Sequence, residues 1–241
     1  LDDQHPLSLQ TTAKVMADGS IAVQMNILAD NRLTETANCV CVFRETGPKL
    51  GTSKMLDIGE AQPASRKNAT YYPDMLFHGE AFQSVQSVDL VASRGNQSRL
   101  QLPSGHWFQS MPGDNGARPF TAQPVLLDGV GQTVGIWLGL QFDQYHVAFP
   151  TGIDEIVFCG PPLQWQDYAS VRVRTAKNDG SPVGPDDLSV TSDAVVLDRA
   201  GHDRLQVRGL RHRRIVMPNL FHEFRGSRQV RLTSVSDELM P

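Results

Sequence analysis

The sequence predicts an α+β protein in which antiparallel sheets each wrap around one central helix. Three observations lead to this fold class. Most of the chain alternates apolar and polar residues over short stretches that end in Gly, Pro, Asn or Asp, which is typical of half-buried antiparallel strands. Residues 124–142 form the one long segment with helical spacing. An internal repeat indicates two copies of one β-meander.

Six stretches carry the alternating pattern, and residues that favour turns separate them. They are residues 22–28, 36–43, 87–91, 98–102, 169–174 and 205–210. A weaker helical pattern covers Glu80 to Val85. We therefore expect a mainly antiparallel sheet with the helix at 124–142 as its centre.

The predicted central helix is apolar along most of its length. Pro124 suits its first turn, and Val130, Val134 and Leu138 lie on one face because they are four residues apart. These features predict a helix that is buried in the core.

Glycines in this helix each cost about 1 kcal/mol relative to alanine, so they need a compensating contact. Gly131, Gly135 and Gly139 are spaced by four and form a smooth stripe. Because a missing side chain lets another backbone approach, we expect a sheet to pack closely on this stripe.

The internal repeat relates residues 6–31 to residues 162–201. Both read Pro-Leu, an alternating strand, a turn with Asp-Gly, and a second alternating strand. The helix precedes the second copy, whereas only Leu1 to His5 precedes the first. We therefore expect the first unit's own helix to be missing from this chain, as in a fragment of a longer polypeptide.

These patterns divide the chain into four predicted parts. Residues 1–45 are the remainder of the first helix-and-sheet unit, and residues 46–70 are a linker rich in Gly, Pro, Ser, Lys and Asn. Residues 71–215 form the second unit with the helix at 124–142, and residues 216–241 are a tail or an inter-domain linker.

Composition is that of an ordinary globular protein: 241 residues, 40% hydrophobic and 20% charged, with a net charge of −4. No apolar run approaches the roughly 20 residues of a membrane helix, and the first 25 residues lack the blocks of a signal peptide. We expect a cytoplasmic protein that binds neither membrane nor nucleic acid.

Cysteine and arginine usage gives no indication of a disulfide framework, a zinc site or a DNA-binding surface. Cys39, Cys41 and Cys159 make an odd count without ligand spacing, so neither a disulfide framework nor a zinc site is indicated. The local basic run at residues 208–214 stands in an acidic chain, so we expect it to cap a strand or meet an acidic protein rather than bind DNA.

Asp128 is the residue most in need of an explanation, because it is acidic within an apolar helix. Gln132 follows four residues later and lies on the same helix face, within hydrogen-bond reach. A structural alternative is that Asp128 compensates the helix dipole from the first turn. The functional interpretation is a proton-transferring carboxyl.

Three segments resemble the landmarks of a known family. Residues 76–83 are similar to an HGPxFQ or YGPxFQ motif, 123–132 to hPxxxD followed by xxxQ or xxxH, and 148–151 to an LP motif. In this order and at this spacing they resemble the dehydratase domain of polyketide and polyunsaturated-fatty-acid synthases. The resemblance implies a double hot-dog fold, which agrees with the repeat.

The resemblance also implies a reaction, the dehydration of a β-hydroxyacyl chain on an acyl carrier protein to the α,β-unsaturated thioester. Asp128 takes the position of the acid and Gln132 that of the hydrogen-bonding residue beside it. The family's base is a histidine in an HxxxGxxxxP motif, and these 241 residues contain no such motif. The expected site therefore includes one half of a proton-transfer pair.

Five further residues match landmark positions and are expected to contact substrate: His78, Gly79, Phe82, Gln83 and Pro150. Alternatives stay open for three of them. His78 could equally pack within a turn, while Phe82 reads first as core and Gln83 as a side chain that satisfies backbone groups. Glu80 stands where the family has proline, and with His78 it favours an iterative synthase over a modular one.

No metal or cofactor is implied, since the substrate thioester already acidifies its α-proton and is carried on the phosphopantetheine of the carrier protein. The implied partners are the acyl carrier protein, neighbouring synthase domains and a second copy in a homodimer. Two other hypotheses compete: an inactive double hot-dog module with a structural or carrier-docking role, and a hot-dog thioesterase.

Overall fold

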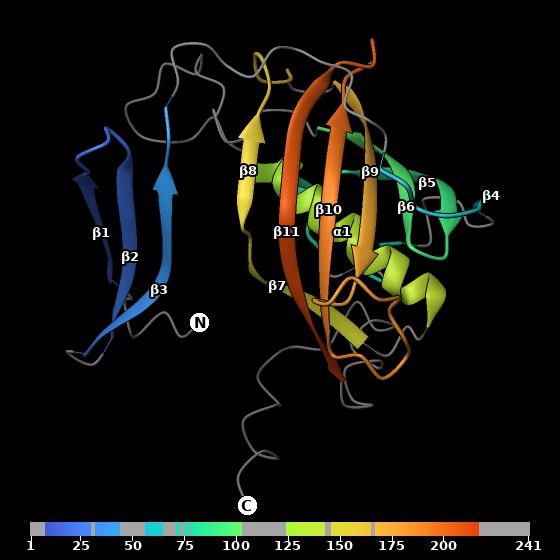
Figure 1. Cartoon of the computed structure of the whole chain (residues 1–241), viewed down its shortest axis with the longest axis horizontal. Coiled ribbons are helices and arrows are strands. Elements are labelled where there is room, and N and C mark those ends of the chain that lie inside the picture. The colour runs from blue at the N-terminus through green and yellow to red at the C-terminus, as the bar shows by residue number, and fades with distance from the viewer. Residues whose placement is uncertain are drawn as a thin grey trace, which may run out of the picture. The chain divides into compact units, whose positions relative to one another are not determined.

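The computed structural model describes residues 8–29, 32–43, 56–64, 71–72, 75–76, 78–102, 124–142, 146–164 and 167–216. The chain divides into two compact units, Leu1–Gly47 and Pro48–Pro241. Both contain antiparallel sheets, and the second contains the long helix (Figure 1).

The first unit is a three-stranded sheet in the order β1-β2-β3. Its strands are β1 (Ser8–Val15), β2 (Ile21–Ala29) and β3 (Arg32–Cys41). Most of its described side chains are exposed or only partly buried. Residues 8–29 and 32–43 contain no helix, in agreement with the prediction from the repeat.

The second unit contains an eight-stranded sheet in the order β4-β5-β6-β9-β10-β11-β7, with β8 paired to β11. All six predicted strand stretches of the chain are confirmed with shifted ends. The strands are β4 (Ala61–Pro63), β5 (Val85–Ala92), β6 (Gly95–Gln101), β7 (His146–Gly152), β8 (Glu155–Phe158), β9 (Tyr168–Ala176), β10 (Ser189–Leu197) and β11 (Asp203–Val216).

The internal repeat is confirmed by the geometry of its turns. Residues 18–20 and 179–181 both read Asp-Gly-Ser and connect paired strands, β1 to β2 and β9 to β10. In each turn the glycine has a φ of 81° and the aspartate Oδ1 accepts hydrogen bonds from the N and Oγ of the serine. The positive φ explains the glycine at both positions.

Helix α1 (Pro124–Gln141) packs against one face of the second unit's sheet, where it contacts β5, β6, β7 and β9 (Figure 1). The predicted inward face is confirmed, because Val130, Val134 and Leu138 are all buried. Apolar residues elsewhere on the helix are buried as well, since the curved sheet covers more than one side of it.

Two hydrogen bonds from side chains fix α1 on the sheet. The Nε1 of Trp137 donates to the carbonyl of Ala92 at 2.9 Å, and the Nδ2 of Asn96 donates to the carbonyl of Thr133 at 3.1 Å. Because all four residues are buried, these bonds are costly to break. They set the rotation of the helix, and with it the direction in which Asp128 points.

The predicted close packing of a sheet on the glycine stripe is wrong. At Gly131 and Gly135 an added Cβ would meet other side chains at the ordinary contact distances of 3.7 and 3.8 Å. The tight fit against the sheet is at Gly129, where a Cβ would lie 2.5 Å from the Oγ of Ser84 and 3.1 Å from Leu100. Spacing shows which residues share a face but not which face meets the sheet.

The helix predicted from Glu80 to Val85 is also wrong, apart from one 3₁₀ turn, η2 (Glu80–Phe82). Val85 begins β5 and pairs with Leu100 of β6. Strand pairing provides regular backbone hydrogen bonds, whereas a helix of six residues is too short to be stable by itself.

The predicted linker at residues 46–70 includes residues that pair with the second unit's sheet. Residues 56–64 belong to the second unit, because β4 pairs with β5 and Ile58 is buried. The predicted tail lies outside the described residues from position 217 onward.

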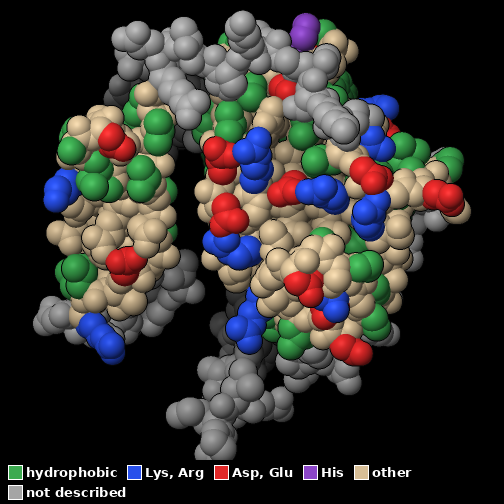
Figure 2. All heavy atoms as spheres, in the orientation of Figure 1, with side chains coloured by type: hydrophobic (Ala, Val, Ile, Leu, Met, Phe, Trp, Pro, Cys, Tyr) green, Lys and Arg blue, Asp and Glu red, His purple; other side chains and the backbone are tan. Residues whose placement is uncertain are grey.

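The outer face of the sheet, turned away from α1, carries positive and negative side chains next to one another (Figure 2). The basic run lies within β11 and does not form one basic surface. Arg208 and Arg211 pair with the carboxylates of residues 154–155, whereas His212 and Arg214 are buried. The run therefore consists of paired, buried and exposed side chains along one strand.

Among the described residues, no helix is long and apolar enough to cross a membrane. The three cysteines are free thiols, and Cys39 is exposed.

Candidate active site

Asp128 is the fifth residue of α1 and lies beyond its first turn. Its side chain is 36% exposed, whereas Gln132, one turn later, is buried. The Nε2 of Gln132 donates to the Oδ2 of Asp128 at 2.6 Å, so the expected hydrogen bond is present. The first-turn position required for the structural alternative is not the one observed.

The amide of Gln132 makes contacts at both of its ends. Its Nε2 also donates to the carbonyl of Phe82 at 2.6 Å, and its Oε1 accepts a hydrogen bond from the hydroxyl of Tyr72. The Tyr72 oxygen accepts in turn from the backbone N of Val85 at 3.0 Å. The amide orientation is therefore fixed by three partners, including Asp128.

Burial raises the pKa of the Tyr72 phenol, and the nearby charge of Asp128 raises it further. The phenol therefore keeps its proton at neutral pH and donates it to the Oε1 of Gln132.

His78 lies on the other side of the carboxyl group. Its Nε2 is 3.5 Å from the Oδ2 of Asp128, and its side chain is 17% exposed. The Nε2 of Gln83 donates to the carbonyl of His78 at 2.9 Å, which confirms the predicted backbone-satisfying role of Gln83. This bond joins Gln83, which follows η2, to His78, which precedes it, and so holds the imidazole next to α1.

Both partners of the Asp128 carboxyl converge on the same oxygen. Gln132 and His78 contact Oδ2, and the described residues place no hydrogen-bond donor on Oδ1. A partly exposed carboxyl with one occupied and one open oxygen can exchange a proton with a bound molecule through the open one.

The structure brings most of the predicted site residues together. His78 and Gln132 contact Asp128, Phe82 takes part through its carbonyl and packs against the core, and Gln83 holds His78. Gly79 caps η2 with an extended backbone, and a Cβ there would meet nothing within 4 Å.

Pro150 is not brought into this cluster. It lies in β7 opposite His212 of β11 and its side chain is exposed. Tyr72 belongs to the cluster although the sequence analysis did not predict it. The only local signal is a Tyr-Tyr-Pro stretch shortly before the 76–83 landmark.

The candidate metal ligands are the His, Cys, Asp and Glu side chains in the part of the chain that the structure describes. No group of three or more His, Cys, Asp or Glu side chains is arranged there to hold a metal ion. The chemistry of the cluster is that of a carboxyl, an amide, a phenol and an imidazole.

A family model described as the polyketide synthase dehydratase N-terminal domain matches residues 57–220. The chain belongs to the polyketide synthase dehydratase family. Among curated protein sequences, none matches this dehydratase-family chain. The matching model is that of an N-terminal domain, yet the matched residues follow the three-stranded unit of Leu1–Gly47. The assignment of residues 71–215 as the second of two hot-dog units stays a prediction.

Solved dehydratase structures share the double hot-dog fold of this chain. An N-terminal dehydratase from the difficidin assembly line is 18% identical with a TM-score of 0.62, and the match covers 93% of this chain and 77% of that one. The dehydratase domain of RzxB from Pseudomonas fluorescens is 16% identical with a TM-score of 0.60, covering 85% and 68%.

A third relative was solved with a bound acyl compound. The dehydratase domain of PpsC from Mycobacterium tuberculosis, in complex with C12:1-CoA, is 17% identical with a TM-score of 0.56. That match covers 86% of this chain and 68% of the other.

Proposed function

We propose that this chain supplies the acid of a dehydration reaction, in which a β-hydroxyacyl chain on an acyl carrier protein becomes the α,β-unsaturated thioester. The observation that carries the proposal is the Asp128–Gln132 pair in a member of a dehydratase family. The pair stands at the landmark positions that gave the resemblance.

Loss of water from a β-hydroxyacyl thioester needs a base at the α-carbon and an acid at the departing hydroxyl. The C–H electrons form the new double bond, the C–O bond breaks, and Asp128 delivers its Oδ1 proton so that water leaves. Gln132 at 2.6 Å and His78 at 3.5 Å stabilise the negative charge then left on Oδ2. The base passes its proton to solvent, and the carboxylate takes one up for the next turnover.

The base is not assigned to a residue of this chain. The resemblance implies a histidine in an HxxxGxxxxP motif, which these 241 residues do not contain. His78 has the contact with Asp128 expected of a residue that stabilises the carboxylate and borders the substrate. Gly79, Phe82 and Gln83 build the turn that follows it.

Substrate and partners follow from the same assignment. The complex of PpsC with C12:1-CoA supports an acyl chain on phosphopantetheine as the substrate form. The partners are the acyl carrier protein and neighbouring synthase domains in a cytoplasmic, homodimeric enzyme. Glu80 and His78, in place of the proline and tyrosine of many relatives, favour an iterative polyketide or polyunsaturated-fatty-acid synthase.

A second candidate is a non-catalytic double hot-dog module that shapes the synthase or docks the carrier protein. The observation that favours it is the absence of HxxxGxxxxP from the sequence. It differs from the first candidate in one respect that can be measured: it predicts no change in a bound β-hydroxyacyl chain.

The test uses the natural polypeptide that carries these residues, incubated with a β-hydroxyacyl carrier protein. Mass spectrometry of the phosphopantetheine arm then identifies the product. The proposal predicts the enoyl thioester, and a much slower reaction for Asp128→Asn. If neither the wild-type protein nor Asp128→Asn changes the β-hydroxyacyl group, the module is non-catalytic. Release of a free acid would establish a thioesterase.

A further inference from the structure

Tyr72 is the one side chain of the Asp128 cluster with no part in the reaction described so far. It lies 60 residues before Gln132 in the sequence, yet its hydroxyl donates to the Oε1 of Gln132. We propose that Tyr72 is a positioning residue, which holds the Gln132 amide so that it presents its N–H, and never its oxygen, to the Asp128 carboxyl. The catalytic part of this inference rests on the proposed dehydration.

The direction of the hydrogen-bond chain is fixed from one end to the other. The backbone N–H of Val85 donates to the Tyr72 oxygen at 3.0 Å, which leaves the phenol proton to point at Gln132. The Nε2 of Gln132 then has two acceptors, the carbonyl of Phe82 and Oδ2 of Asp128, both at 2.6 Å. These hydrogen bonds therefore connect the start of β5, through the Tyr72 phenol, to α1.

An amide without such partners could turn by half a rotation about its last bond. Its oxygen would then face the carboxyl and accept the proton that Asp128 must give to the substrate. In the observed orientation Gln132 contacts Oδ2 as a donor only. The proton of the neutral acid is therefore kept on Oδ1, which has no donor among the described residues.

Phe82 and Tyr72 hold opposite ends of the same amide. The Phe82 carbonyl lies at the end of the short η2 turn, and Tyr72 is anchored independently by the backbone of Val85. Two anchors on different segments constrain the amide more tightly than either alone. Burial of Gln132 makes each bond stronger than it would be in water.

A purely structural role for Tyr72 makes different predictions from a positioning role. A structural hydroxyl would stabilise the fold, and its loss would lower the unfolding midpoint without changing the reaction of the folded enzyme. A positioning hydroxyl acts on the reacting carboxyl through Gln132. Its loss lowers kcat, leaves KM nearly unchanged, and has no effect once Gln132 is absent.

The test compares Tyr72→Phe with the matched control Tyr168→Phe, which removes a phenol hydroxyl at the start of β9, where Arg199 lies over the ring. In the natural polypeptide we expect Tyr72→Phe to lower kcat about tenfold, the factor for one buried hydrogen bond, and Tyr168→Phe to leave it unchanged. In a Gln132→Ala background, Tyr72→Phe should lower kcat no further.

A second readout needs no turnover. In NMR spectra, the two Nε2 protons of Gln132 should shift and exchange faster with solvent in Tyr72→Phe, and should stay unchanged in Tyr168→Phe. An unchanged Gln132 signal, or an unchanged kcat with a lowered unfolding midpoint, would overturn the proposal. If the wild-type protein forms no enoyl thioester while the Gln132 signal still responds, the proposed function fails and the positioning of the amide stands.

Discussion

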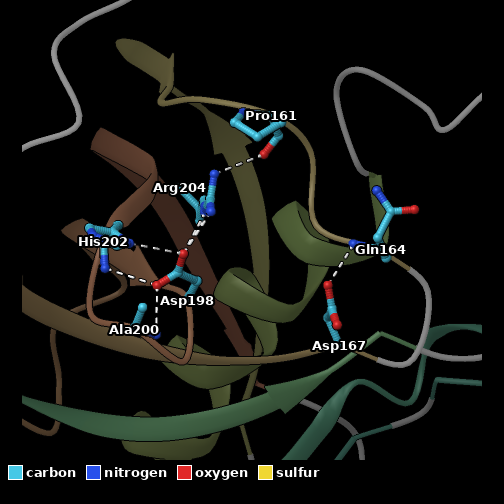
Figure 3. Close-up of polar contacts among 7 residues, drawn as sticks. All are labelled: Pro161, Gln164, Asp167, Asp198, Ala200, His202 and Arg204. Carbon is cyan, nitrogen blue, oxygen red and sulfur yellow. Dashed lines mark hydrogen bonds and ion pairs between the residues drawn. The ribbon is translucent and has the colours of Figure 1, made fainter.

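Two carboxylates of the second unit, Asp198 and Asp128, have opposite surroundings. Asp198 follows β10, and both of its oxygens are occupied (Figure 3). Oδ1 accepts from the backbone N of Ala200 and of His202 at 2.8 and 2.9 Å, and Oδ2 accepts from the guanidinium of Arg204 at 2.7 and 2.9 Å. Among the described residues, the contacts of the Asp128 carboxyl with Gln132 and His78 are both on Oδ2.

The difference teaches how one unit separates a structural carboxylate from a reactive one. Burial opposes ionisation of Asp198, but the backbone N–H of His202 and the Arg204 guanidinium outweigh it and lower its pKa to about 2. A carboxylate with every lone pair occupied has nothing left to offer a substrate. Asp128 is held firmly on one side and is open on the other, as a proton donor requires.

The largest expected effect is that of Asp128→Asn on the rate. Replacing the acid should slow dehydration by about 10²–10⁴-fold, because an amide cannot protonate the leaving hydroxyl. The unfolding free energy should change little, since the side chain is partly exposed. Turnover on a β-hydroxyacyl carrier protein measures the rate, and urea unfolding measures the stability. A rate within a few-fold of wild type would show that Asp128, like Asp198, is not the reacting carboxyl.

The converse substitution, Asp198→Asn, should act on stability and not on chemistry. It removes the paired bonds to Arg204, which is itself only 18% exposed, and should cost about 2–3 kcal/mol of unfolding free energy. The rate per folded molecule should stay at the wild-type value. A urea denaturation series checks the first expectation, and a slowed reaction in the fully folded variant would contradict the second.

The pH dependence of stability should report the same ion pair. The pKa of Asp198 is about 2 in the folded protein and about 3.9 in an unfolded chain, so its ionised form favours folding. This contribution, about 2–3 kcal/mol, is complete above about pH 5 and is lost progressively as the pH falls through about 4 and then about 2. Unfolding followed across that range should show a smaller slope for Asp198→Asn than for wild type, and identical slopes would refute the assignment.

The smallest expected effect on kcat is that of replacing His78, and its size distinguishes two roles for this residue. If His78 only stabilises the carboxylate on Oδ2, His78→Phe should lower kcat about tenfold or less, in line with a contact at 3.5 Å. A loss as large as that of Asp128→Asn would instead identify His78 as the base. Steady-state rates of the two variants, measured side by side, decide between these roles.

Much of this site could be predicted because its central pair is local. Asp128 and Gln132 are four residues apart on one helix, so their contact follows from helix geometry, and the 76–83 landmark marked His78 and Gln83. The two Asp-Gly-Ser turns, at residues 18–20 and 179–181, could be predicted for the same reason, because their hydrogen bonds join residues two apart in sequence.

Contacts that depend on tertiary packing could not be predicted. Tyr72 reaches Gln132 across 60 residues, and nothing in its own neighbourhood specifies that partner. The prediction that a sheet packs closely on the glycine stripe was wrong for a related reason. The rotation of α1 is set by hydrogen bonds to residues distant in sequence, such as that from Trp137 to Ala92. Pro150 matched a short motif, which by itself carries no information about distance from Asp128.

The most direct test of Asp128 as the acid uses a substrate that needs none. A β-acetoxyacyl thioester loses acetate, which leaves without protonation, so only the base is required for its elimination. We predict that Asp128→Asn is slower than wild type by about 10²–10⁴-fold on the β-hydroxyacyl substrate, yet within about threefold of wild type on the β-acetoxy substrate. An equal loss on both substrates would contradict the account, because Asp128 would then act on something other than the leaving group.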